Sequence, residues 1–498
     1  MSTAKTADQT IFARRESEAR SYCRSFDAVF TKGQNATLTD TEGREYIDFL
    51  AGCSSLNYGH NDPDMKAALM EHIAGDGIAH GLDMMTDAKA RFLETFEKIV
   101  LEPRGMDHKI MMTGPTGTNA VEAALKLARK VTGRRDVIAF TNGFHGMSLG
   151  ALAATGNAGK RHGAGGAPLD GIARMPYEGA FGPDVDTLAQ IEMLLDNPSS
   201  GIDAPAAFLV ELVQGEGGLN AASKEWVEGI ARIAKKHGSL LIVDDIQAGI
   251  GRTGDFFSFD GMDVEPDMVT LAKSLSGFGL PFAVMLMKRE LDIWKPAEHN
   301  GTFRGNNHAF VTSATMLDEF WSDDSFAQDV RRGAGIIEDG LEAIARKHGG
   351  GLYRKGRGMM QGISCPQGDL AGRVVASAFQ QGLIIETSGA DDAFRNEVAG
   401  KAGLLEERLS RIAEMVPGAR LKGRGMMRGV DVGSGELAEE ICAEAFRNGL
   451  VIETSGAHDE VVKVLAPLTI PRAQFEEGLT ILENAARTCT GTTKIAAE

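Results

Sequence analysis

The sequence predicts an α/β protein built on a mostly parallel sheet with helices on both faces. Short apolar runs alternate with helical patterns through the middle of the chain. The runs lack the polar–apolar alternation of half-exposed strands, which is typical of strands buried on both faces. We expect strands at Lys109–Thr113, Asp136–Phe140, Ala206–Leu212, Ser239–Asp245, Met268–Ala272 and Phe282–Met287. In such sheets ligands bind in the loops beyond the carboxyl ends of the strands.

The segment Ser223–Gly238 illustrates the helical pattern between two of these strands. Its apolar residues recur at helical spacing, from Trp226 to Ala234. Ser223 can cap the first turn, and Gly238 can end the helix in the left-handed conformation. The segment is therefore expected to be a helix that covers one face of the sheet.

Composition excludes several classes of protein. A chain of 498 residues accommodates a large α/β domain and a smaller one. The formal net charge of -17 argues against a nucleic-acid partner. The polar start MSTAKTADQT and the absence of an apolar run of about 18 residues predict no signal peptide and no membrane span, hence a cytoplasmic protein. The scattered cysteines and histidines lack ligand spacing, so reduced thiols and no metal site are expected.

A tandem repeat occupies the C-terminal third of the chain. Two similar segments begin at Lys355 and Lys422, 67 residues apart (422 − 355), and the copies extend over about 330–392 and 398–459. Two copies are too few for a solenoid, so we expect a duplicated piece of a small domain, with one copy inserted. Only the second copy continues into Val461–Pro471, which favours a functional role for that copy. The expected domains are 1–75 and 319–498, which form the small domain, and 76–318, which forms the large one.

The stretch LIVDDIQAGIGRTG contains the glycine spacing of a dinucleotide-binding turn, but the residues before the glycines do not fit such a turn. Glycines of such a turn follow the strand directly and open a helix, whereas Asp244-Asp245-Ile246-Gln247 intervenes here. A dehydrogenase is therefore disfavoured. A carboxylate at a strand end has another use, because pyridoxal phosphate (PLP) is an electron sink only while its pyridine nitrogen stays protonated. A buried aspartate beside that nitrogen keeps it protonated.

The other parts of a PLP site lie after neighbouring apolar runs. Lys273 follows the next run, where its amine can form a Schiff base with the cofactor. The glycine-rich turn of Gly114–Lys130 leads into a helix whose first N–H groups can hold a phosphate. Phe144 and His145 follow another strand, in position to cover a ring face. Each feature alone has an ordinary structural explanation, but their common place at successive strand ends predicts a PLP site.

Two segments resemble the class III aminotransferases, the ω-aminotransferases of fold type I PLP enzymes. They are DTEGREYIDFLAG with NYGHNDP, and DDIQAGIGRTG followed by LAKSLSGFGLPFA, with Asp245 where most members have Glu. The resemblance covers nearly the whole chain apart from one repeat copy. It implies a large domain with a mostly parallel sheet, and a smaller α+β domain formed by the two termini. HGLDMMT, GPTGTNAVEAA, NGTFRGNNHA and GLVIETSGAHDEVVK resemble the branch that transfers the amine of L-glutamate to L-aspartate 4-semialdehyde, the first step of ectoine synthesis.

The resemblance also implies roles for individual residues. Lys273 would bind PLP covalently and act as general acid and base, and Asp244 would contact the pyridine nitrogen. The remaining cofactor contacts would be Gln247 at the ring oxygen, Phe144 and His145 at the ring, Gly117 and Thr118 at the phosphate, Glu211 near the ring, and Thr302 from a partner subunit. A homodimer would therefore be the smallest active unit.

One part of the family pattern differs here. Glu216 occupies the position of a glutamate that relatives pair with an arginine in an R-x-x-P-P-L motif, but this chain has Lys463 in VKVLAPL. Lysine keeps the charge and loses the planar fork that binds a carboxylate with two hydrogen bonds. Either Lys463 binds the substrate carboxylate as a point charge, or Arg304, Lys160 or Arg161 does.

Other functions stay open on the sequence alone. Acetylornithine, ornithine or 4-aminobutyrate are alternative substrates for an enzyme of this family. An aminomutase of the same fold would need no second keto acid. The extra 67-residue module (422 − 355) is also compatible with a non-catalytic variant whose small domain is disrupted.

Overall fold

The computed structural model describes residues 11–365, 368–389, 393–424, 426–456, 458–466 and 472–491. Internal contacts divide the chain into two compact units. The larger comprises Met1–Pro366 and Leu370–Ala390, and the smaller comprises Gln367–Asp369 and Asp391–Glu498. The division by contacts thus separates the two repeat copies, whereas the sequence suggested one domain over 319–498. Each unit is described separately below.

A seven-stranded sheet forms the centre of the larger unit, with strand order β4-β12-β11-β10-β7-β5-β6. Its strands are β4 (His108–Gly114), β5 (Val137–Phe140), β6 (Ile172–Met175), β7 (Ala207–Val210), β10 (Leu240–Asp244), β11 (Met268–Leu271) and β12 (Ala283–Lys288). All six expected strands are present. β12 runs antiparallel to both of its neighbours, and the other strands are parallel. β6 was not expected from the sequence, because IARM is short and carries a charged residue.

The sheet is buried on both faces, as the apolar runs predicted. Alternate residues of β10 enter different apolar layers: Leu241 and Val243 join one, and Ile242 joins the other. Phe208 of β7 belongs to the first layer and Leu209 to the second. Burying each such side chain contributes roughly 1.5–3 kcal/mol, so the strands' polar ends, and not their middles, are where ligands can be reached.

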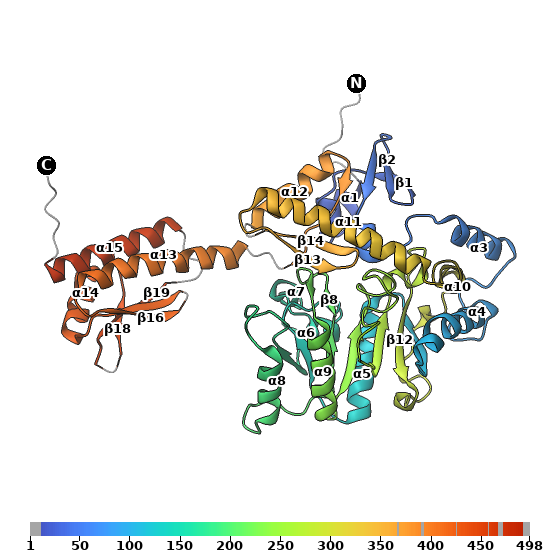
Figure 1. The fold of residues 1–498 in the computed structure, drawn as a ribbon, viewed down its shortest axis with the longest axis horizontal. Coiled ribbons are helices and arrows are strands. Elements are labelled where there is room, and N and C mark those ends of the chain that lie inside the picture. The colour runs from blue at the N-terminus through green and yellow to red at the C-terminus, as the bar shows by residue number, and fades with distance from the viewer. Residues whose placement is uncertain are drawn as a thin grey trace. The chain divides into compact units, whose positions relative to one another are not determined.

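Helices α5 (Gly117–Thr132) and α9 (Lys224–Lys236) pack against this sheet (Figure 1). The predicted capping of α9 is confirmed: the Ser223 side chain accepts a hydrogen bond from the Trp226 N–H at 3.2 Å, and Gly238 has φ 60°. The other helices of this part of the chain are α1 (Ile11–Arg15), α2 (Ala51–Ser54), α3 (Pro63–Ala74), α4 (Asp87–Phe96), α6 (Leu149–Ala154), α7 (Ala158–His162), α8 (Thr187–Asp196) and α10 (Asn307–Phe320).

The first repeat copy packs against the N-terminal segment within the larger unit. It comprises α11 (Ser325–His348), the hairpin of β13 (Tyr353–Arg357) and β14 (Met360–Ser364), α12 (Gly368–Gln380) and β15 (Leu383–Ile384). β15 pairs in parallel with β3 (Glu45–Asp48), which continues the sheet of β1 (Phe30–Gln34) and β2 (Thr37–Asp40). A two-stranded ribbon of β8 (Val213–Gln214) and β9 (Asn220–Ala221) completes the unit's strands.

The second copy lies in the smaller unit, which has its own apolar core. Its elements are α13 (Ala393–Met415), β16 (Arg420–Arg424), β17 (Met427–Asp431), α14 (Gly435–Arg447), β18 (Glu453–Ser455), β19 (Val461–Leu465) and α15 (Arg472–Thr490). The strands form an antiparallel sheet in the order β16-β17-β19-β18. Both copies follow the order helix–strand–strand–helix–strand, and a common origin by duplication stays a prediction. Residues 467–471 of the expected continuation lie outside the described residues.

Within the described parts of the chain, no helix combines the length and the apolar character needed to span a membrane.

Candidate active site

Asp244 is the last residue of β10, and two side chains are hydrogen-bonded to its carboxylate. His145 Nδ1 lies 2.7 Å from Asp244 Oδ2, and the Thr270 hydroxyl donates to Oδ1 at 2.9 Å. The side chains of His145 and Asp244 are 1% and 3% exposed, so water does not screen the pair. Burial lowers the pKa of His145, but the hydrogen bond and charge of Asp244, together with Glu211, raise it overall. This arrangement fixes the position of the Asp244 side chain at the strand end.

Lys273 follows the neighbouring strand β11 and begins a short 3-10 helix, Lys273–Ser276. Asp244 pairs in register with Thr270 of β11, only three residues before Lys273, so both side chains emerge at the same edge of the sheet. Burial lowers the pKa of the Lys273 amine, an effect that nearby Cys53, Glu216, Glu211 and Asp244 oppose. A lysine with a lowered pKa more readily supplies the neutral, nucleophilic amine.

Backbone conformation at Lys273 is left-handed, with φ 51°. Such a conformation costs about 1–3 kcal/mol in a non-glycine residue and is concentrated at functional sites. Ser274 secures the turn, because its hydroxyl donates to the Ser54 carbonyl at 2.7 Å and accepts from the Asn57 N–H at 3.0 Å. The N-terminal segment of the chain thereby helps to set the direction of the lysine.

The N-terminus of α5 is a candidate anion cradle near Asp244. Its first residue, Gly117, has no space for a side chain, because an added Cβ would lie 2.8 Å from Ile246 Cδ1. The Thr118 hydroxyl lies 2.6 Å from the Ser148 hydroxyl, which donates to Glu122 at 2.6 Å. Free N–H groups and the helix dipole make such a start a phosphate site. Ile246 follows Asp244 by two residues, so cradle and carboxylate are neighbours.

The side chain of Glu211 contacts the Phe144 backbone. Its carboxyl group accepts the Phe144 N–H at 2.8 Å and is buried. Burial and the charge of Asp244 raise the pKa of Glu211 to about 8, against the opposing effect of His145. Burial beside Asp244 therefore opposes ionisation of Glu211.

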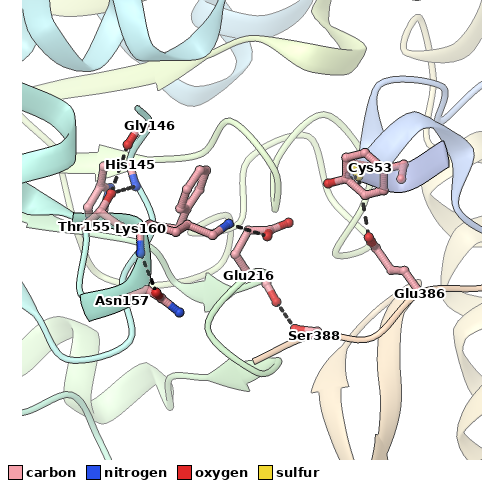
Figure 2. A network of polar contacts seen from close by, with 12 residues as sticks. Cys53, His145, Gly146, Thr155, Asn157, Lys160, Glu216, Glu386 and Ser388 are labelled. Atoms are coloured by element: carbon pink, nitrogen blue, oxygen red, sulfur yellow. Dashed lines mark hydrogen bonds and ion pairs between the residues drawn. The ribbon is translucent and has the colours of Figure 1, made fainter. Parts of the chain in front are cut away.

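The Lys160 amine contacts both the Phe144 ring and the Glu216 carboxylate. Its Nζ lies 4.3 Å from the centre of the Phe144 ring and 3.3 Å from Glu216 Oε2. Figure 2 shows the Lys160 side chain extending toward Glu216. The ion pair is partly exposed, with side-chain exposures of 38% and 25%, so it contributes little to stability and can exchange partners. Of the candidates for binding a substrate carboxylate, Lys160 is therefore the one that the structure brings to Glu216.

A second polar group borders Glu216 and comes from distant parts of the chain (Figure 2). Cys53 Sγ lies 2.9 Å from the Tyr22 hydroxyl and 3.6 Å from Glu386 Oε2. Ligand atoms of Cys53, Glu216 and Glu386 all lie within 4.8 Å of one another. Burial raises the pKa of the Cys53 thiol to about 11, so it is a neutral group at pH 7. We name Tyr22, Cys53, Glu216 and Glu386 the distal cluster.

The loop that carries Glu386 is attached directly to the loop of Glu216. The Ser388 hydroxyl donates to the Gly215 carbonyl, and the Gly389 N–H donates to the Glu216 carbonyl at 3.1 Å. This loop belongs to the first repeat copy, whereas the sequence favoured the second for a functional role. Sequence reasoning missed Glu386, Cys53 and Tyr22; the repeated ETSG segment was the only available signal, and it occurs in both copies.

The remaining candidates occupy different positions. Gln247 faces Gly215, where an added Cβ would lie 1.9 Å from its amide oxygen. Thr302 is exposed, and its carbonyl lies 2.8 Å from His80 Nε2. The side chains of Arg161 and Arg304 donate to backbone carbonyls, to Thr155 at 2.9 Å and to His299 respectively. In the smaller unit, Lys463 forms an ion pair with Glu453 at 2.7 Å.

These residues fit PLP on structural grounds. A Cβ at Gly117, the start of α5, would lie 2.8 Å from Ile246 Cδ1, the Asp244 carboxylate is hydrogen-bonded to His145, and Lys273 is a buried amine at the same sheet edge. His145 is hydrogen-bonded to Asp244, and its expected place at the ring face stays a prediction.

Comparison with known proteins gives the family. The model of the class III aminotransferases matches residues 19–395. The chain belongs to this family. Accordingly it is an aminotransferase, and its cofactor is PLP. The match includes the first repeat copy and ends at the start of α13, so the predicted family and fold class are confirmed.

Individual relatives agree with this assignment. A diaminobutyrate–2-oxoglutarate transaminase of Halomonas elongata is 48% identical over 477 residues, which cover 96% of this chain and 98% of the relative. A protein of the same name from Vibrio parahaemolyticus is 54% identical over 383 residues, 77% of this chain and 90% of the relative. Among solved structures, the taurine:2-oxoglutarate aminotransferase of Bifidobacterium kashiwanohense has a TM-score of 0.62 at 19% identity, with 93% of each chain covered.

Proposed function

We propose that this enzyme transfers the amine of L-glutamate to L-aspartate 4-semialdehyde and so produces 2-oxoglutarate and L-2,4-diaminobutyrate, the first step of ectoine synthesis. The observation that carries the chemistry is the position of Lys273 and Asp244 at the ends of adjacent strands. The names of the relatives support the choice of substrates. Small molecules are its partners, and neither nucleic acid nor a membrane is among them.

PLP, when bound, supplies an electron sink for the substrate's reacting carbon. Asp244 holds the positive charge of the pyridine nitrogen, and His145 and Thr270 keep the carboxylate in place. Lys273 holds the cofactor and, once released, moves a proton at the reacting carbon. Residues at the start of α5, Gly117 and Thr118, bind the phosphate.

Further contacts complete the proposed site. Phe144 covers the ring and Gln247 binds its oxygen, while Glu211 closes the pocket. Glu216 and Lys160 form the exchangeable pair at the substrate's far end. Arg304 stays an alternative ligand of the substrate carboxylate.

We further propose a cytoplasmic homodimer in which Thr302 contacts the partner's cofactor phosphate. Thr302 is exposed in the single chain, beside Phe303, which is 67% exposed. Met85 is 100% exposed. Large apolar side chains in such positions are typical of surfaces that another protein covers.

Replacement of Lys273 by alanine tests the proposal. The parent, supplied with PLP, should develop the yellow absorbance of a lysine-bound cofactor, and glutamate should bleach it. Lys273→Ala should bind PLP without that band and lose aspartate-semialdehyde-dependent formation of 2-oxoglutarate. A band retained in the variant would remove Lys273 from its role.

Substrate comparison separates the remaining alternatives. We expect faster turnover of diaminobutyrate than of acetylornithine, ornithine or 4-aminobutyrate with 2-oxoglutarate. The reverse order would favour another ω-aminotransferase. Activity without a keto acid would indicate an aminomutase, and a protein that stays colourless with PLP would indicate a non-catalytic variant.

A further inference from the structure

We propose that Glu386, together with Glu216, binds the ammonium group at the far end of the substrate, while Lys160 binds the carboxylate on the same carbon. The inference rests on the proposed function, because L-aspartate 4-semialdehyde and L-2,4-diaminobutyrate present an ammonium and a carboxylate on the carbon distant from the cofactor. It assigns a specificity-determining role to the first repeat copy.

The geometry provides both charges in the required order. The positive charge of Lys160 lies 3.3 Å from Glu216 Oε2, and the carboxylate of Glu386 lies on the other side of the distal cluster, within 4.8 Å of Glu216. A substrate carbon that bears both a carboxylate and an ammonium group would therefore lie between a cation on one side and two carboxylates on the other. On binding, the substrate carboxylate pairs with Lys160, and the substrate ammonium pairs with Glu216 and Glu386.

Glu386 has no cation in direct contact among the described residues. Two carboxylates approach each other in the distal cluster, and Lys160 forms an ion pair with Glu216 alone. Surrounding protein and the charge of Glu216 raise the pKa of Glu386 to about 7, an effect that Cys53, Lys273 and Lys160 oppose. A bound ammonium group would favour the ionised carboxylate and remove this repulsion.

The groups around Glu386 favour an organic ammonium group over a transition metal as the ligand. Burial raises the pKa of the Cys53 thiol to about 11, so the thiol is a neutral neighbour of Glu386 at pH 7. Burial also raises the pKa of the Tyr22 hydroxyl, which stays a neutral hydrogen-bonding group. Neutral donors and two carboxylates suit an organic ammonium group better than a transition metal.

The position of Glu386 is also fixed by the chain. Its loop is joined to the Glu216 loop by the hydrogen bonds of Ser388 and Gly389. β15, two residues before Glu386, pairs with β3 and so approaches the N-terminal segment that supplies Cys53. The carboxylate is thus held from two sides of the substrate region, although the side chain itself remains solvent-accessible.

Glu386→Gln tests the inference in the PLP-loaded enzyme. We expect kcat/KM for diaminobutyrate to fall by about 10-fold or more, mainly through KM, because one charge-assisted hydrogen bond is lost. The single-turnover absorbance change with glutamate should stay within about 2-fold of the parent, because the distal end of glutamate has no ammonium group. Glu386→Asp should recover part of the loss.

The repeat supplies a matched control. Glu453 occupies the equivalent position of the second copy (386 + 67) and pairs with Lys463. Glu453→Gln should leave the diaminobutyrate KM unchanged. An effect of Glu453→Gln without an effect of Glu386→Gln would overturn the inference, as would equal losses in the glutamate and diaminobutyrate half-reactions of Glu386→Gln.

A pH profile gives an independent readout. In the parent, kcat/KM for diaminobutyrate should rise as pH increases through about 7, where Glu386 ionises, and Glu386→Gln should lack this rise. A profile unchanged by the substitution contradicts the inference. Loss of parent activity with EDTA and recovery with Zn²⁺ would also contradict it, in favour of a metal. A parent that reacts with neither glutamate nor diaminobutyrate refutes the proposed function before any variant is compared.

Discussion

Replacement of His145 by leucine should destabilise the larger unit strongly, because it removes the partner of a buried carboxylate. His145 Nδ1 and Asp244 Oδ2 are 2.7 Å apart, and the side chains are only 1% and 3% exposed. Removing one member of such a buried pair costs about 3–5 kcal/mol. His145→Asn keeps an N–H donor near the Nδ1 position without the charge. Since charge-assisted hydrogen bonds are roughly twice as strong as neutral ones, this variant should lose about half as much.

The effect of His145→Leu should also depend on pH. The pKa of His145 in the native protein lies above its ordinary value of 6.5. Stability from this group is therefore present in full below pH 6.5 and is lost as pH rises through the raised native pKa. The difference between parent and variant should be largest at pH 6 and smaller at pH 9.

Urea unfolding of the cofactor-free proteins, followed by tryptophan fluorescence, measures this difference. All three tryptophans, Trp226, Trp294 and Trp321, belong to the larger unit, so the signal reports on that unit. His108→Leu is the control: this buried histidine bonds only to the Pro266 carbonyl, at 3.0 Å, and its loss should cost about 0.5–1.5 kcal/mol. A His145→Leu loss no larger than the His108→Leu loss, or one independent of pH, would refute the reasoning.

Two further substitutions test the neighbours of Asp244. Asp245 is fully buried, and burial raises its pKa to about 7. The parent should therefore lose stability relative to Asp245→Asn as pH rises from 4 to 7, and at pH 8 the variant should be more stable by about 2–4 kcal/mol in urea unfolding. Equal pH dependence in the two proteins would contradict this expectation. Gly117→Ala would place its Cβ 2.8 Å from Ile246 Cδ1 and should weaken PLP binding about 10-fold in a fluorescence titration. Gly340→Ala, on a helix with free space around the glycine, is its control, and equal Kd values for the two variants would count against the anion cradle.

Much of the fold was accessible from the sequence because the central strands are buried on both faces. Continuous apolar runs therefore marked their positions, and the polar residues at their ends marked the ligand side of the sheet. Asp244 and Lys273 follow adjacent strands, so their proximity required only the order of the strands. The antiparallel direction of β12 could not be deduced, since a run buried on both faces has the same composition in either direction.

The distal cluster was not predictable in the same way. Cys53 and Glu386 are 333 residues apart and meet only because β15 joins the N-terminal sheet. No local pattern marks a carboxylate whose role depends on such a contact. The repeat added a second difficulty, because ETSG occurs in both copies and pattern alone cannot say which copy packs beside Cys53. His145 shows a third limit: the sequence places it next to Phe144, but does not show that its ring is hydrogen-bonded to Asp244, 99 residues away.

The buried and the more exposed charged groups of the proposed site lie in different electrostatic environments. The Asp244 carboxylate is hydrogen-bonded to His145 and Thr270. Burial and the charge of Asp244 raise the pKa of Glu211, one strand away, to about 8, so the environment opposes a second buried negative charge. The exchangeable charges, Lys160 and Glu216, are more exposed, where partner exchange costs less.

Chemical capture of the cofactor lysine tests the central claim most directly. Borohydride reduction of the PLP-loaded protein, followed by peptide mass spectrometry, should place a single pyridoxyl group on the side chain at position 273, and pretreatment with glutamate should prevent the labelling. A pyridoxyl group on another lysine, or a protein that acquires none, would contradict the account.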